Sequence, residues 1–154
     1  MRVILQRVTE ASVDVDGAAH GAIGAGLVVL VGIEHRDTVE DVKWLANKVW
    51  NVRLWANEEG GKPWSASAKT LQHGLLVVSQ FTLHARLKGN KPDFHGAMPP
   101  EKVSRKNASA LWGALLRVGV FIARTRTRGR TCARTCLFVV HWLQVFRCVC
   151  SVGG

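Results

Sequence analysis

The hydrophobic positions in the first part of the chain fall into short blocks that predict β-strands. Residues 2–8 (RVILQRV) have the pattern of a strand, and residues 11–16 (ASVDVD) alternate between apolar and polar, as a half-buried strand does. Asp16-Gly17 is a hairpin signal because glycine adopts a positive φ without steric cost, so residues 18–24 are expected to pair back. Residues 27–33 (LVVLVGI) are apolar throughout, which predicts a central strand covered on both faces.

An amphipathic helix is expected next. Asp37 and Glu40 have the spacing of a capping box and predict that the helix starts at Asp37. The apolar residues that follow recur at the i, i+3, i+4, i+7 spacing of one helix face: Val42, Leu45, Ala46 and Val49. Residues 52–55 (VRLW) then return to a strand, and residues 57–63 (NEEGGKP) form a turn or loop.

The pattern beyond this point predicts one more strand and one more helix. Residues 75–83 (LLVVSQFTL) form the strand, and residues 84–98 form a polar loop. Pro99-Pro100 suits the first turn of a helix, because the donor that proline lacks has no partner there, and that helix is expected over about 101–117. This order of elements predicts a single α/β domain, with a mixed sheet and helices on one face.

Charge divides the chain into two parts. Residues 1–100 carry 11 Lys and Arg against 10 Asp and Glu, whereas residues 101–154 carry 10 basic residues and one acid, Glu101. No stretch reaches the roughly 18 apolar residues of a membrane span, and the N-terminus lacks the pattern of a secretory signal. We therefore expect a cytoplasmic protein with no membrane partner.

The strand at 75–83 ends in polar groups for which a core strand has no obvious use. Ser79, Gln80 and Thr82 follow the apolar run LLVV. A strand end beside a loop points main-chain N–H groups and short hydroxyls into a crevice, where they can hold a carbonyl oxygen or an ammonium group. The alternative is a satisfied polar pair where the strand leaves the core, and the residues alone favour that alternative.

Three blocks of sequence in register resemble the D-aminoacyl-tRNA deacylase family. They are MRVILQRVTEASV at the start, LLVVSQFTL in the middle and LKGNKPDFHGAMPP after it, and together they cover about residues 1–101. The form KGNKPDFH is similar to the eukaryotic branch. The resemblance implies a three-layer α/β fold, with helices over mixed β layers, which would be incomplete at the C-terminus of this chain.

The resemblance also implies an activity. Members of the family hydrolyse the ester that joins a D-amino acid to the 3′-terminal ribose of tRNA, remove glycine from mischarged tRNA, and so proofread chirality in translation. They work as homodimers with a site at the subunit interface, and the implied partner is the aminoacylated 3′ end of tRNA. No cofactor is implied, and residues 1–100 show no His, Cys or carboxylate grouping with metal-ligand spacing.

The first site motif of the family corresponds here to Ser79, Gln80, Phe81 and Thr82, which are the candidate catalytic residues. An activated ester mainly needs to be positioned and to have its oxyanion stabilised, for which main-chain N–H groups near Phe81 and Thr82 are suited. Thr82 is expected to position the ester, because a threonine nucleophile needs an adjacent base. His84 shares a face with Thr82 if the strand continues, but a Thr82–His84 dyad is the minority interpretation. Gln80 and Phe81 are expected to line the pocket for the 3′-terminal nucleotide.

Basic residues complete the expected substrate site. The resemblance implies that Arg7, in the first strand, braces a Gly-Pro pair. Lys88 and Lys91 follow SQFT in the loop, where they either bind tRNA phosphates or belong to a solvated loop, and the sequence leaves both interpretations open. Asp93 and His95 are expected to shape the loop.

The chain departs from the family after about residue 101. The second site motif of the family is a Gly-Pro pair with a cis peptide, whose carbonyls exclude the side chain of an L-amino acid, but none of the four prolines here follows a glycine. We therefore expect a deacylase-like domain at 1–120 and a divergent Arg/Cys-rich tail at 121–154. Selectivity for D-amino acids should fail before ester hydrolysis does. The alternative function is a tRNA- or nucleic-acid-binding protein with impaired catalysis.

Three interpretations of the tail compete. Arginines alternate at positions 124, 126, 128 and 130, as a basic arm for phosphates would require. The four cysteines lack the usual zinc spacing, and His141 does not supply it, which disfavours a metal site. The abrupt change of composition favours the third interpretation, a segment that does not encode evolved structure, as a reading-frame slip or an alternative 3′ exon would produce.

Overall fold

A computed structural model describes five stretches of the chain: residues 1–15, 18–57, 61–98, 138–139 and 150–151. The predicted turn at Asp16-Gly17, the helix expected over about 101–117 and most of the tail lie outside the described residues.

The main sheet has four strands in the order β1-β4-β7-β10. β1 (Arg2–Val8) runs antiparallel to β4 (Gly26–Gly32), and β7 (Gly74–Ser79) runs parallel to β4 on its other side. β10 (Phe138–Val139) pairs in parallel with the end of β7. All but one residue of β4 are buried, so the predictions of a mixed sheet and of a central strand covered on both faces are confirmed.

A second, smaller sheet contains the hairpin that the alternating pattern predicts. β2 (Glu10–Val15) and β3 (Ala18–Ile23) pair antiparallel, with a register shift between Val13 and Asp14. β11 (Cys150–Ser151) pairs antiparallel with the start of β2. The expected return of the chain after the first two strands is therefore confirmed.

Helix α1 (Val39–Asn51) buries the predicted apolar stripe. Val42 is fully buried, Ala46 and Val49 are nearly so, and Leu45 packs partly buried against the same cluster. Fully burying a valine side chain such as that of Val42 contributes about 1.5–3 kcal/mol, so tertiary packing rather than intrinsic propensity holds the helix in place.

The N-cap of α1 differs from the predicted one. The cap is Thr38, whose hydroxyl accepts a hydrogen bond from the Asp41 N–H at 3.3 Å, while the Asp41 carboxylate accepts one from the Thr38 N–H at 2.8 Å. The predicted box of Asp37 and Glu40 is therefore wrong. Asp37 instead accepts a hydrogen bond from the N-terminal ammonium group at 2.6 Å, a tertiary contact that the local sequence does not reveal.

The chain leaves the main sheet earlier than predicted. β7 ends at Ser79, and the predicted strand over 75–83 is replaced beyond that point by a short 3₁₀ turn, η1 (Phe81–His84). The SQFT segment therefore straddles a strand end and a turn, which changes the directions in which its side chains point.

Two short hairpin-like pairs complete the described structure. β5 (Arg53–Trp55) confirms the strand predicted there and pairs with β6 (Ala66–Ser67). β8 (Arg86–Lys88) and β9 (Lys91–Asp93) form a hairpin inside the stretch predicted to be a polar loop. Gly89 in its turn has a φ of +62°, a conformation that glycine adopts without strain.

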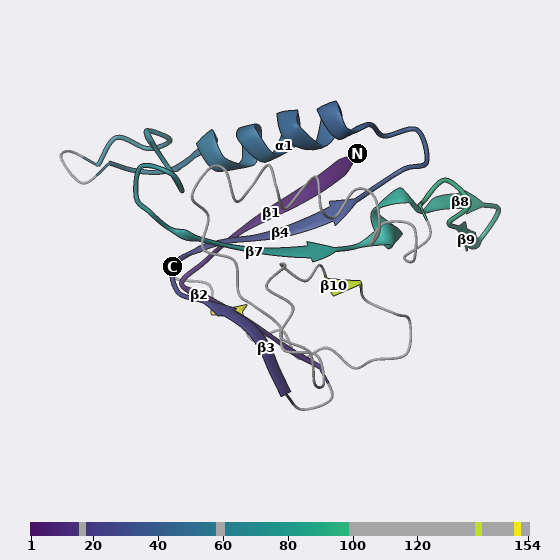
Figure 1. The fold of residues 1–154 in the computed structure, drawn as a ribbon, viewed down its shortest axis with the longest axis horizontal. Coiled ribbons are helices and arrows are strands. Elements are labelled where there is room, and N and C mark those ends of the chain that lie inside the picture. Colours follow the sequence, from purple (N-terminus) through teal and green to yellow (C-terminus); the bar gives the residue numbers. More distant parts are fainter. Residues whose placement is uncertain (16–17, 58–60, 99–137, 140–149, 152–154) are drawn as a thin grey trace.

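The elements stack in three layers (Figure 1). Helix α1 lies over one face of the main sheet, and β2 and β3 lie against the other. Alternate residues of β7 divide between the two interfaces: Leu75 and Val77 join the cluster beneath α1, and Leu76 and Val78 join the cluster facing β2. The predicted α/β class is confirmed, and the two cores hold the end of β7 firmly in place.

Candidate active site at the end of strand β7

The SQFT segment turns around the end of β7. Ser79 is the last residue of the strand and is buried, and the Gln80 N–H still donates to a carbonyl of β4 at 2.8 Å. The Leu83 N–H then donates to the Gln80 carbonyl at 3.3 Å, and the Ala85 N–H donates to the Thr82 carbonyl at 3.0 Å. These bonds close a tight turn directly at the carboxyl ends of the parallel strands.

Thr82 is held by a neighbouring side chain. The Gln80 amide Nε2 donates to Thr82 Oγ1, so the hydroxyl acts as an acceptor and has a fixed orientation. His84 does not share a strand face with Thr82, because the strand has already ended; its ring is buried with Nδ1 at 2.9 Å from Glu34 Oε1. The geometric basis of a Thr82–His84 dyad is therefore wrong, and a positioning role suits Thr82 better than a nucleophilic one.

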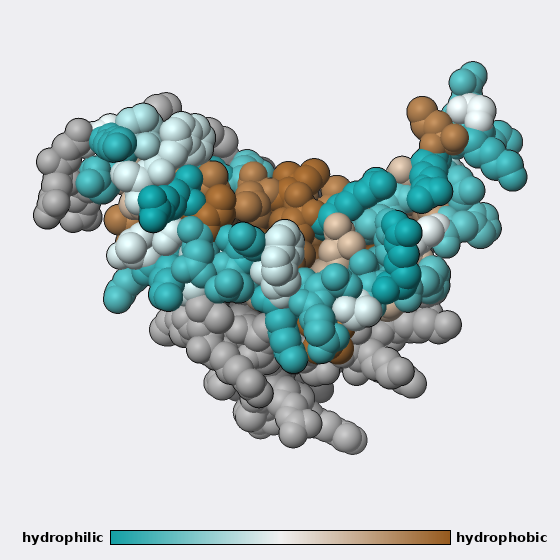
Figure 2. All heavy atoms as spheres, turned by 90° about the horizontal axis from the view of Figure 1, so that it is seen from above, coloured by the Kyte–Doolittle hydropathy of each residue, from teal (hydrophilic) through white to brown (hydrophobic). Residues whose placement is uncertain are grey.

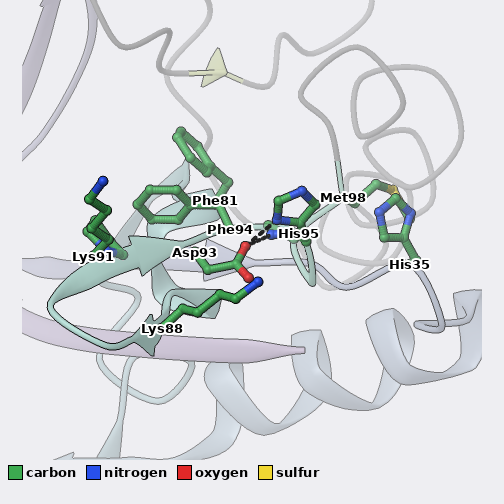
Figure 3. Close-up of a pocket in the computed structure, with 10 residues that line it drawn as sticks. His35, Phe81, Lys88, Lys91, Asp93, Phe94, His95 and Met98 are labelled. Carbon is green, nitrogen blue, oxygen red and sulfur yellow. Dashed lines mark hydrogen bonds and ion pairs between the residues drawn. The ribbon is translucent and has the colours of Figure 1, made fainter.

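A pocket of about 710 Å³ opens between this turn and the β8–β9 hairpin (Figure 3). Phe81 lines it from the turn and Phe94 from the end of the hairpin, and their rings meet edge to face with centroids 5.4 Å apart. His35, which follows β4, and Met98 lie on the other side of the pocket. An aromatic wall beside an open mouth suits a flat ring such as an unstacked nucleobase.

The two predicted lysines lie at this pocket. Lys88 and Lys91 are exposed, line the pocket, and stand directly opposite one another across the hairpin. Like charges held opposite each other repel, so an anion bound between them would relieve that repulsion.

Asp93 and His95 shape the base of the hairpin, as the sequence predicts. The Asp93 carboxylate accepts a hydrogen bond from the His95 N–H at 2.9 Å and lies against Nδ1 of the His95 ring. The hydrogen bonds from the His95 side chain and backbone hold the pKa of Asp93 below its ordinary range. The carboxylate therefore stays ionised and tempers the positive charge of the lysines.

Only part of the predicted site faces the pocket. The predicted residues that line it are Phe81, Lys88 and Lys91. Arg7 lies on β1, where its Nη1 donates to the Leu54 carbonyl at 2.7 Å and ties β1 to β5.

Sequence reasoning missed five lining residues: His35, Pro92, Phe94, Ala97 and Met98. A signal for His35 was present, because this residue lies two positions after the end of the predicted central strand. Side chains gather where parallel strands such as β4 and β7 end at the same edge of a sheet.

Among the residues that the structure describes, no three His, Cys, Asp or Glu side chains are grouped so as to hold a metal ion. No helix in the same stretches is long and apolar enough to cross a bilayer.

The region that contains the site is similar to known proteins. The family model described as D-Tyr-tRNA(Tyr) deacylase matches residues 4–125, a range that includes the SQFT turn and the hairpin. D-aminoacyl-tRNA deacylase 1 of Leishmania major is 48% identical over 101 residues, which cover 66% of this chain and 66% of that protein. The protein of the same name from Homo sapiens is 49% identical over 102 residues, which cover 66% of this chain but only 48% of the human protein.

Solved structures share the fold. The protein named c-Myc DNA Unwinding Element Binding Protein has a TM-score of 0.70 at 44% identity, covering 76% of this chain and 77% of that one. A structure described as a probable eukaryotic D-amino acid tRNA deacylase has a TM-score of 0.68 over 96% of this chain and 92% of its own, but at 17% identity it shows the fold alone. Because the family model spans most of the sequence, from β1 through the hairpin, the chain belongs to the D-Tyr-tRNA(Tyr) deacylase family.

Proposed function

We propose that this chain hydrolyses the ester bond of D-aminoacyl-tRNA, and of mischarged glycyl-tRNA, releasing the free amino acid and tRNA. The observation that carries the proposal is the SQFT turn at the wall of an aromatic pocket, inside the stretch that the family model matches. Relatives named D-aminoacyl-tRNA deacylase support it, with about half of the aligned positions identical.

The proposed chemistry relies on positioning. Gln80 holds the Thr82 hydroxyl, and the first N–H groups of η1, at Phe81 and Thr82, have no partners within the turn because they begin it. Such N–H groups are suited to stabilising the oxyanion of an ester under attack by water. Ser79, buried at the strand end, fixes the start of this arrangement.

The proposed substrate contacts lie in the pocket. The terminal base would pack against Phe81, beside Phe94, and the backbone phosphates would meet Lys88 and Lys91. The role that the family resemblance implies for Arg7, which is to brace a Gly-Pro pair, has no such pair to act on in this chain; Arg7 instead ties β1 to the Leu54 carbonyl of β5.

We also propose a homodimer. β1 is an edge strand among the described strands, and Ile4 on it is 50% exposed. Figure 2 shows a hydrophobic band hollowed between two hydrophilic projections. Surfaces of this kind favour association with another protein surface, and a second copy of the chain is the partner that the family resemblance implies.

Poor discrimination between D- and L-amino acids is part of the proposal. No Gly-Pro pair occurs in the sequence, so the group that would exclude an L side chain has no counterpart here. We keep the division into a deacylase-like domain at 1–120 and a divergent tail at 121–154.

Nucleic-acid binding without turnover is the second candidate function. Lys88 and Lys91 at the pocket favour it, as does the similarity to a protein whose name describes DNA binding. The two candidates differ in turnover, because a binding protein would retain the tRNA without hydrolysing its ester.

The test is deacylation of D-Tyr-tRNA and L-Tyr-tRNA side by side, with Thr82→Ala and Gln80→Ala as variants. We expect hydrolysis of both substrates by the unaltered chain and a loss of about 10²-fold in each variant, the effect of a misplacement of about 1 Å. Lys43→Gln, an exposed change on α1, is the control and should leave the rate unchanged. Binding of tRNA without hydrolysis by the folded protein would establish the second candidate instead.

A further inference from the structure

His84 is a buried ionisable side chain that the proposed chemistry leaves without a role. It ends η1, is 2% exposed, and packs its ring onto Gly32 at the end of β4. Its Nδ1 lies 2.9 Å from Glu34 Oε1, but the two groups are not aligned as a hydrogen bond, so the contact is mainly electrostatic. The other side-chain anchor of this turn, from Arg2 Nη1 to the Leu83 carbonyl at 2.9 Å, is exposed to solvent. His84 is therefore the buried anchor of the turn.

Glu34 is itself fixed from several directions. Arg36 Nε donates to its carboxylate at 2.7 Å, and the Glu34 N–H donates to Asp37 at 2.6 Å. Desolvation alone would raise the pKa of Glu34, but Arg36, His84 and the N-terminal ammonium group together lower it. Glu34 therefore presents a charged carboxylate to His84 from a fixed position.

Three walls of the pocket meet at this pair. η1, which carries Phe81, ends at His84, and β8 begins two residues later. His35, on the opposite wall, follows Glu34 directly in the chain. The Glu34 backbone also forms an isolated antiparallel bridge with Ala97, another lining residue. A single electrostatic contact thus connects the turn, the hairpin and the far wall.

We propose that Glu34 and His84 form a positioning pair that fixes the SQFT turn against the hairpin pocket. The pair acts through Phe81 and Thr82 and touches neither the substrate nor the reacting atoms. The Gln80 N–H fixes the entry of the turn to β4, and the pair fixes its exit. The inference rests on the proposed deacylase activity, and its test includes a readout that does not depend on that activity.

The experiment compares His84→Leu with His84→Gln. Leucine fills the space but removes the partner of Glu34 Oε1 and leaves the carboxylate with Arg36 at Oε2, whereas glutamine keeps an N–H donor for Oε1. His73→Gln is the matched control, because His73 is a partly buried histidine that does not line the pocket. For each protein we would measure kcat and KM on D-Tyr-tRNA, together with amide hydrogen exchange in η1, in the hairpin and in β4.

The expected result is a fall in kcat of about 10-fold or more for His84→Leu, with KM changed less than about threefold, and recovery to within about threefold in His84→Gln. Exchange should speed up in η1 and at the start of β8 while β4 stays protected. Adding Glu34→Gln to His84→Leu should cause little further loss, because the two residues act as a unit.

Two results would refute the proposal that Glu34 and His84 form a positioning pair. One is a folded His84→Leu with unchanged kcat and unchanged exchange in η1; the other is an equal loss of protection in η1 and β4, which would mean a general stability role. If His84→Leu does not fold, hydrogen exchange in His84→Gln is compared with that in the His73→Gln control. Faster exchange in η1 than in β4 would then support the pair, and equal exchange would refute it. If the unaltered chain hydrolyses no D-Tyr-tRNA, the proposed function fails. The hydrogen-exchange measurements alone then test whether Glu34 and His84 hold the turn.

Discussion

Gly32 is the position where one added methyl group tests how tightly the SQFT turn is docked. A Cβ there would lie 2.8 Å from Cδ2 of His84 and 2.9 Å from Cβ of Leu83, whereas ordinary contact begins at 3.4 Å. The turn would therefore have to retreat by about 0.6 Å, the shortfall of the first distance. Because His84 is 2% exposed, its ring is packed among neighbouring groups and cannot simply turn out into solvent. Overpacking of this kind costs about 1–3 kcal/mol, and we expect Gly32→Ala to lose about 2 kcal/mol.

The assay is urea unfolding of Gly32→Ala together with its deacylation rate. We expect a lower midpoint at unchanged slope and a rate reduced by about 10-fold or more, since the displaced turn carries Phe81 and Thr82. Gly96→Ala is the control, because a Cβ at Gly96 meets nothing within 4 Å; its stability should stay within about 0.5 kcal/mol. A Gly32→Ala protein as stable and as active as the unaltered chain would refute the close docking of η1 on β4.

Three further predictions follow from other contacts. Thr38→Ala removes the N-cap of α1 and should cost about 1 kcal/mol, measured as a lower unfolding midpoint. His73 has a pKa lowered by burial from its ordinary value of 6.5, so the unfolded chain binds more protons and stability is lost as the pH falls below 6.5. His73→Gln should therefore reduce the difference in unfolding free energy between pH 7.5 and pH 5.5. Replacing both Lys88 and Lys91 with glutamine should reduce the salt slope of tRNA binding by about 1.4, at about 0.7 for each phosphate contact on a single strand.

Each of these predictions has a result that contradicts it. Thr38→Ser keeps the capping hydroxyl, so its unfolding midpoint should stay close to that of the unaltered chain. An equal loss of stability in Thr38→Ala and Thr38→Ser would show that the hydroxyl does not stabilise the helix. For His73→Gln, a pH dependence identical to that of the unaltered chain would show that this histidine titrates alike in both states. For the lysines, an unchanged salt slope, matching that of Lys43→Gln, would place the phosphates elsewhere.

The sequence was sufficient wherever burial alone decides the structure. β4 was predictable because LVVLVGI leaves no polar face, and α1 because its stripe from Val42 to Val49 fits a helix period and no other. The N-cap of α1 was not predictable, because Asp37 and Thr38 are both good cap residues. Which of them caps the helix depends on the contact between Asp37 and the N-terminal ammonium group.

The candidate site was predictable in composition but not in geometry. The residues of SQFTL have no local signal that ends the strand at Ser79, because the ladder stops when the turn bonds of Gln80 and Thr82 form. The β8–β9 hairpin was missed because its strands are short and exposed, although the Gly89-Asn90 pair between them is a known turn signal. The resemblance to the family identified the SQFT segment, but only the structure shows that Phe81 faces the pocket.

The parallel pairing of β4 with β7 sets the order in which the molecule assembles. Gly26 pairs with Gly74, so the first contact between these strands closes a loop of about 48 residues that includes α1. Contacts between residues so far apart in sequence form slowly, because the chain loses loop entropy before any pairing compensates for it. β1 and β4, which are nearer in sequence, can pair before β7 arrives. The turn that carries SQFT therefore forms late, after β1 and β4 have already paired in a growing or refolding chain.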